Sequence, residues 1–179
     1  MSTFSYFAYG SNLLSSRLVG RCASATFSSI AVVRRHRLEF TKPSIDGSGK
    51  ATIISDETAQ GSVFGAVFQI SNAELETLDA FEGKDYERRP CQVTCVRTGR
   101  EIGALTYYAR QRRSELLPYD WYLALVVAGL NEHEIDREYV SAIRSLDHKI
   151  DAEHGRIQRR AALEAFKLAG VDDYKALLR

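Results

Sequence analysis

The stretch Tyr6-Phe-Ala-Tyr-Gly-Ser-Asn-Leu-Leu14 passes from one structural pattern to another. Its first residues are aromatic or small and suit a half-buried strand, whereas its final leucine pair begins a helical pattern. We predict a strand over residues 3–9 and a helix over residues 12–20 with Asn12 or Ser11 near its N-cap. The turn between them combines a glycine with polar side chains and the free N–H groups of a helix start. It is therefore expected to hold an anionic part of a ligand.

Apolar patterning on the C-terminal side of this stretch predicts strands before helices. We expect strands over residues 25–33, 37–41, 51–55 and 62–70, a hairpin over 86–96 and 101–109, and helices over 119–130 and 134–146. Short strands joined by turns suggest a curled sheet. The tail carries Ile157, Leu163 and Phe166 at helical spacings. The sequence therefore predicts an α+β fold with a helical C-terminal tail.

Composition and charge restrict the classes of function. The 179 residues are 45% hydrophobic and 26% charged, which suits one sizeable core. A formal net charge of +1 gives no general attraction to nucleic acid or to an anionic membrane. No apolar run approaches the length of a membrane span, and residues 1–4 do not resemble a signal peptide, so we expect a cytoplasmic protein. The three cysteines are expected to be buried free thiols, with no metal site.

A second distinctive stretch is Leu78-Asp-Ala-Phe-Glu-Gly83. We predict that Ser71 or Asn72 caps a helix that presents Leu75, Leu78 and Phe81 on one face and ends at Gly83. Glu82 then lies in the last turn, where the negative end of the helix dipole mildly disfavours an ionised carboxylate. That setting suits a general base, although the segment alone equally fits an ordinary helix end with a solvated glutamate.

Two other motifs are considered and set aside. The stretch Gly47-Ser-Gly-Lys50 lacks the first glycine and the following helix of a phosphate-binding loop, so we interpret it as a plain loop. Ser11 could be a hydrolase nucleophile, but the turn lacks the second glycine of the usual elbow, and no histidine is an obvious base. The arginine pairs of the chain are interpreted as solvated surface.

The two distinctive stretches together resemble the γ-glutamylcyclotransferase family, which has a Tyr-Gly-Ser-Asn turn and a glutamate in a Leu-Asp-x-x-Glu-Gly segment. Further similarity occurs at Ala51-Thr-Ile, Val63-Phe-Gly-Ala-Val-Phe, Pro118-x-x-x-Tyr122 and Gly129, so the resemblance covers about residues 4–146. It implies a small mixed β-barrel with flanking helices. It also implies an enzyme that releases 5-oxoproline from a γ-glutamyl amino acid or amine.

The resemblance assigns roles to particular residues. Glu82 is the expected acid/base, and Tyr122 is expected to offer its hydroxyl to the same pocket. The residues expected to line the γ-glutamyl pocket are Tyr6, Phe7, Ala8, Tyr9, Gly10 and Ser11. We expect the family domain over residues 1–146, with residues 147–179 as a helical extension packed on it or at an oligomer contact. No cofactor, metal, nucleic acid or membrane is expected as a partner, and a homodimer is a candidate assembly.

The chemistry follows from the substrate class. In a γ-glutamyl compound the α-amine can reach its own γ-carbonyl and close a five-membered ring, so the enzyme needs no nucleophile of its own. One carboxylate can take the ammonium proton and return it to the leaving amine. The alternative is a non-catalytic module that binds a γ-glutamyl or amino-acid-like ligand. Glu82 favours the enzyme, because a buried carboxylate is costly in a mere binding pocket.

Overall fold

The computed structural model describes residues 2–56 and 61–179. Its strands are β1 (Thr3–Ala8), β2 (Thr26–Arg34), β3 (His36–Pro43), β4 (Gly49–Ser55), β5 (Ser62–Ser71), β6 (Tyr86–Cys95) and β7 (Glu101–Ala109). Its α-helices are α1 (Ser15–Val19), α2 (Leu75–Glu82), α3 (Asp120–Glu132), α4 (Arg137–Arg144) and α5 (Ile157–Leu168). Single 3₁₀ turns are η1 (Ser11–Leu13), η2 (Asn72–Glu74) and η3 (Tyr174–Leu178). The predicted α+β class is confirmed.

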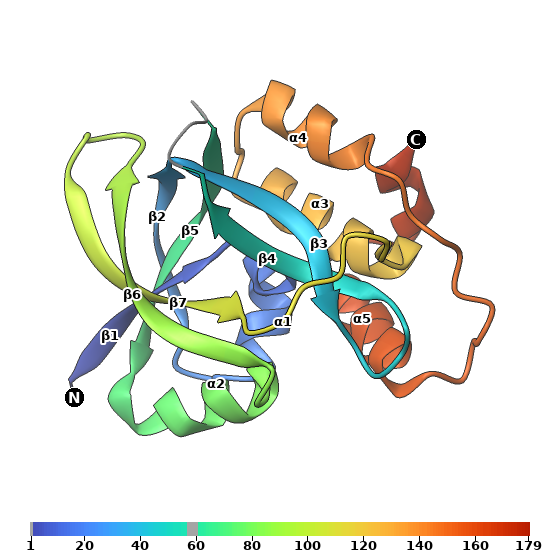
Figure 1. Cartoon of the computed structure of the whole chain (residues 1–179). Coiled ribbons are helices and arrows are strands. Elements are labelled where there is room, and N and C mark those ends of the chain that lie inside the picture. Colours follow the sequence, from blue (N-terminus) through green and yellow to red (C-terminus); the bar gives the residue numbers. More distant parts are fainter. Residues whose placement is uncertain (1, 57–60) are drawn as a thin grey trace.

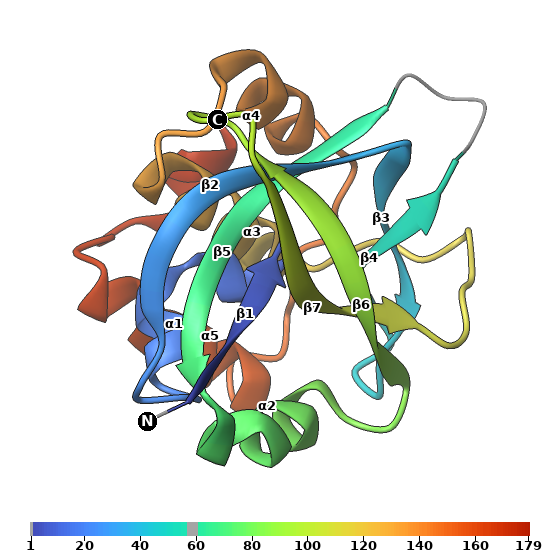
Figure 2. The same ribbon diagram turned by 90° about the vertical axis from the view of Figure 1, so that its left-hand side faces the viewer.

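The strands form a closed barrel in the order β1-β5-β2-β6-β7. β1 and β7 close it in parallel, at Tyr6 and Leu105, while the other pairs are antiparallel. β3 and β4 form a separate hairpin beside the barrel (Figures 1 and 2). Helix α2 lies at one end of the barrel. Gly65 of β5 permits the tight closure, because a Cβ there would lie 2.3 Å from the Ala8 carbonyl oxygen. The expected mixed barrel is confirmed.

Helix α3 is the central element of the helical side of the molecule (Figure 1). Every residue from Asp120 to Leu130 is buried, because η1, α4, α5 and η3 pack around this helix. It packs closely against η1 at Gly129, where a Cβ would lie only 2.5 Å from the Cβ of Leu13. His133 reinforces this contact, since its Nε2 lies 2.9 Å from the Leu13 carbonyl oxygen. The C-terminal end of α3 is thus held beside the turn that follows β1.

The C-terminal tail packs onto the same body. α5 contacts α1 and α3, and η3 contacts α3. The Ser16 hydroxyl donates a hydrogen bond of 2.7 Å to the Ala165 carbonyl. Phe166 is buried, but Ile157 is 72% exposed and Leu163 is 38% exposed, so the apolar spacing did not identify the buried face of α5. That face consists of Arg159, Ala162, Ala165 and Phe166. The division into residues 1–146 and 147–179 stays a prediction, and Met1 lies outside the described residues.

Two local predictions were wrong. The single helix expected over residues 12–20 is divided into η1 and α1, and neither has a side-chain N-cap. Asn12 is only 3% exposed because its side chain turns inward instead of capping. Phe81 is 52% exposed, so it does not share the buried face of Leu78. By contrast, α2 ends at Gly83 as predicted, with a φ of 78° that favours glycine.

The structure also shows the state of the cysteines, the character of the helices and the grouping of possible metal ligands. The three cysteines are buried free thiols, as predicted. None of the helices in the described part of the chain has the length and apolar content of a membrane span. Across residues 2–56 and 61–179, no three His, Cys, Asp or Glu side chains converge as they would around a metal ion.

Candidate active site

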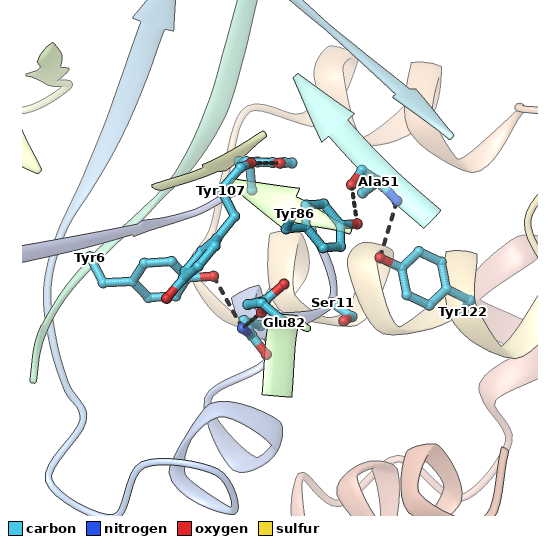
Figure 3. A pocket seen from close by; sticks show the side chains of 10 residues that line it. Tyr6, Ser11, Ala51, Glu82, Tyr86, Tyr107 and Tyr122 are labelled. Carbon is cyan, nitrogen blue, oxygen red and sulfur yellow. Dashed lines mark hydrogen bonds between the residues drawn. The ribbon is translucent and has the colours of Figure 1, made fainter. Parts of the chain in front are cut away.

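A cavity of about 290 Å³ lies where β1 ends, between the barrel, the β3–β4 hairpin and α3 (Figure 3). Its lining consists of Tyr6, Tyr9, Gly10, Ser11, Asn12, Ala51, Glu82, Tyr86, Tyr107 and Tyr122. Most of the predicted site residues are therefore brought together. Phe7 and Ala8 are not part of this lining, and their side chains are fully buried. Their assigned binding role stays a prediction.

Glu82 lies at the end of α2 and directs its carboxylate into the cavity (Figure 3). Asn12 Nδ2 donates to Oε1 at 2.7 Å, and Arg21 Nη1 approaches the same oxygen at 3.4 Å. Arg21 Nη1 also donates to Asn12 Oδ1 at 2.9 Å, which fixes the orientation of the amide. The other carboxylate oxygen, Oε2, accepts no hydrogen bond from the described residues. It is available for exchange of a proton with a bound molecule.

Tyrosines line the barrel side of this cavity. Tyr6 OH accepts a hydrogen bond of 3.1 Å from Asn12 Nδ2. Tyr107 packs edge-on against the Tyr6 ring and donates to Asp79 Oδ1 at 2.7 Å. Burial raises the pKa of the Tyr6 hydroxyl, and the charge of Glu82 raises it further. Tyr6 therefore stays protonated and can act as a hydrogen-bond donor at neutral pH.

The opposite wall is organised by the backbone of Ala51 on β4. Tyr86 OH donates to the Ala51 carbonyl at 2.6 Å, and the Ala51 N–H donates to Tyr122 OH at 3.1 Å (Figure 3). Gly10 lies against this wall, because a Cβ there would be 3.1 Å from the Ala51 Cβ. Burial raises the pKa of the Tyr122 hydroxyl. The structure thus places Tyr122 and Glu82, which are distant in sequence, on one cavity.

The surroundings of Ser11 do not match a hydrolase nucleophile. Its hydroxyl accepts a hydrogen bond of 3.2 Å from Arg17 Nε, which cannot act as a base. One ring nitrogen of each histidine, His36, His133, His148 and His154, has a hydrogen-bond partner other than Ser11. No described histidine is therefore arranged to activate Ser11.

A second cavity of about 570 Å³ adjoins the first and shares Ser11, Glu82, Tyr86 and Tyr122 with it. We call it the cationic chamber, after the basic residues in its lining: Arg17, Arg21, Lys42 and Lys50. Lys50 pairs with Asp46 at 2.8 Å and lies over the Trp121 and Tyr122 rings. Burial lowers the pKa of Lys50 to about 8, although Asp46 acts against this shift.

Sequence reasoning missed several of these residues. Tyr86 and Tyr107 lie in strands, where aromatic residues usually serve the core, so no local signal marked them. The arginines had a weak signal: Arg17 and Arg21 are four residues apart after the polar turn, a spacing that places side chains on one side of a helix. Asn12 was expected at a helix cap instead of in contact with Glu82.

Comparison with known proteins identifies clear similarities. The model of the AIG2-like family matches residues 62–143. The chain is 33% identical over 152 residues to the gamma-glutamylcyclotransferase of Bos taurus, a match that covers 81% of this chain and 79% of the bovine protein. The Homo sapiens protein of the same name is 29% identical over 153 residues, with the same coverage. A solved structure named gamma-glutamyl cyclotransferase is similar with a TM-score of 0.81 and 26% identity, covering 93% of this chain and 99% of that one.

Proposed function

Because this chain belongs to the γ-glutamylcyclotransferase-like family, we propose that it is an enzyme that releases 5-oxoproline from a γ-glutamyl amino acid or amine. The observation that carries this proposal is the position of Glu82. Its carboxylate borders the tyrosine-lined cavity, is held through one oxygen by Asn12 and Arg21, and keeps the other oxygen open to a ligand.

In the proposed reaction Glu82 acts as both base and acid. Its carboxylate takes a proton from the α-ammonium group of the substrate, and the resulting amine attacks the γ-carbonyl carbon. The tetrahedral intermediate then collapses, the bond from the γ-carbon to the leaving nitrogen breaks, and Glu82 returns the first proton to that nitrogen. The ring nitrogen loses its second proton to the released amine, which leaves as an ammonium ion. The products are 5-oxoproline and a free amine or amino acid, and no oxidant, metal or enzyme nucleophile takes part in these steps.

The remaining lining residues have binding roles in this proposal. The turn at Gly10 and Ser11 holds the α-carboxylate through backbone N–H and hydroxyl groups. Tyr6 and Tyr122 each accept a hydrogen bond from the protein, so each keeps its own hydroxyl hydrogen for a substrate oxygen. A donor directed at the developing oxyanion lowers the barrier, because it strengthens as negative charge builds up.

Incubation of the purified protein with a panel of γ-glutamyl dipeptides, γ-glutamyl amines and glutathione tests the proposal, with 5-oxoproline as the measured product. Release that depends on Glu82 is the expected result. Binding of these compounds without release would instead favour the non-catalytic binding module. The cytoplasmic location and the homodimer stay predictions.

A further inference from the structure

Among the residues that the structure describes, one basic side chain of the cationic chamber forms no salt bridge. Three of its four basic residues pair with carboxylates: Arg21 with Glu82, Lys42 with Asp85 and Lys50 with Asp46. Arg17 has no carboxylate within 4.0 Å among the described residues, and its Nε donates only to the neutral Ser11 hydroxyl. The chamber therefore has the charge balance of a site for one additional anionic group.

The setting of Arg17 strengthens this interpretation. Burial, and in the same direction the neighbouring charge of Arg21, lower the pKa of Arg17 to about 9. A guanidinium group normally keeps its proton far above this range. Removing such a charge from water is costly unless a partner of opposite charge is present. A bound carboxylate would supply that partner through two parallel N–H donors.

An apolar groove continues from the chamber. This groove is open to solvent and shares Arg17, Arg21, Phe81 and Gln158 with the chamber. Its other walls come from the end of α1 and from one side of α5. The apolar side chains that line it are Phe81, Ile157, Ala161, Ala165 and Leu168. Phe81, Ile157 and Leu168 are largely exposed, which leaves an apolar surface open to a ligand.

The proposed reaction connects these two features. The leaving nitrogen must lie beside Glu82, which borders both the first cavity and the chamber. In a γ-glutamyl amino acid, the carbon attached to that nitrogen carries a carboxylate and a side chain. We propose, on the basis of the proposed function, that Arg17 binds the carboxylate of the leaving amino acid and that the apolar groove receives its side chain. The preferred substrates are then γ-glutamyl derivatives of apolar amino acids, not γ-glutamyl amines.

A matched pair of substrates tests the role of Arg17. γ-Glutamyl-leucine and γ-glutamyl-isoamylamine differ only in the leaving-group carboxylate, and 5-oxoproline release gives kcat/KM for each. The wild-type protein is expected to prefer the leucine compound. Arg17→Met should lower kcat/KM for that compound about 10- to 100-fold, the effect of losing a charge-assisted contact, and leave kcat/KM for the amine compound nearly unchanged. Arg137→Met, at an exposed arginine on α4, should change neither value.

The outcomes separate this inference from the proposed function. Equal loss on both substrates would mean that Arg17 serves the γ-glutamyl part, and an unchanged preference would mean that it binds no leaving-group carboxylate. Either result overturns the inference about Arg17 but leaves the proposed release of 5-oxoproline intact. Release of 5-oxoproline from γ-glutamyl-isoamylamine by Arg17→Met shows that this variant is folded. If the wild-type protein releases 5-oxoproline from no compound, the proposed function itself fails.

A second comparison tests the groove. γ-Glutamyl-leucine and γ-glutamyl-serine share the leaving-group carboxylate but differ in the polarity of the side chain. The wild-type protein should prefer leucine, and Phe81→Ser should reduce the leucine-to-serine ratio of kcat/KM several-fold because the groove loses its largest apolar wall. A ratio that Phe81→Ser leaves unchanged, or a wild-type preference for serine, would contradict the assignment of the groove.

Discussion

Replacing Glu82 by glutamine is expected to abolish most turnover without unfolding the protein. In the wild-type protein, Asn12 Nδ2 donates a hydrogen bond of 2.7 Å to Glu82 Oε1. Glutamine keeps the shape of the side chain and an oxygen that can accept this hydrogen bond. It cannot take up the ammonium proton. Since acid–base catalysis contributes at least about 100-fold, kcat should fall by that factor or more, equivalent to about 2.7 kcal/mol of barrier.

The cost in stability can be worked out from the same contacts. Asn12 and Arg21 both approach Oε1, and a hydrogen bond to a charged group contributes about 1 kcal/mol more than one between neutral groups. Glu82→Gln should therefore lower the free energy of unfolding by about 1 to 2 kcal/mol, well within the usual stability of a domain.

Steady-state release of 5-oxoproline and urea denaturation measure the two effects. Glu76→Gln is the matched control, because Glu76 is an exposed glutamate on the same helix. It should alter neither kcat nor the denaturation midpoint. A loss of only a few-fold in Glu82→Gln, in a protein that is still folded, would show that another group transfers the proton.

Three further predictions concern Ser11, Tyr122 and Asp46. Mass spectrometry of enzyme quenched during turnover should find no acyl adduct on Ser11, and trapping one would revive the hydrolase hypothesis. Tyr122→Phe should weaken substrate binding or turnover by about 0.5 to 1.5 kcal/mol, and it should also destabilise the fold by about 1 to 3 kcal/mol, because the buried Ala51 N–H loses its acceptor. Equal denaturation midpoints for the wild-type protein and Tyr122→Phe would argue against this hydrogen bond. Burial alone would raise the pKa of Asp46, but Lys50 and Ser48 hold it at about 2. Stability should thus fall by about 2 kcal/mol as pH drops from about 4 to about 2, and urea titrations of Asp46→Asn should lack this loss.

The sequence by itself determined the local elements and the two stretches that meet in the site. The aromatic strand before Gly10, the end of α2 at Gly83 and the hairpin over β6 and β7 follow from periodicity and turn chemistry. These signals lie within a few residues of the structure that they specify. The position of Glu82 in the last turn of its helix was predictable for that reason, whereas its contact partners were not.

Only the tertiary structure decided how these elements form one cavity. Asn12 turns away from a helix cap because Tyr6 and Glu82, the latter seventy positions along the chain, offer its amide hydrogen-bond partners. Tyr86 is held in the site by the hydrogen bond from its hydroxyl to the Ala51 carbonyl. Barrel closure and the placement of the β3–β4 hairpin bring these two residues together. The missing counter-ion of Arg17 could likewise be recognised only once the carboxylates of the other basic residues were located in space. Charge pairing and burial depend on distances between segments that are remote in sequence, and no local pattern encodes those distances.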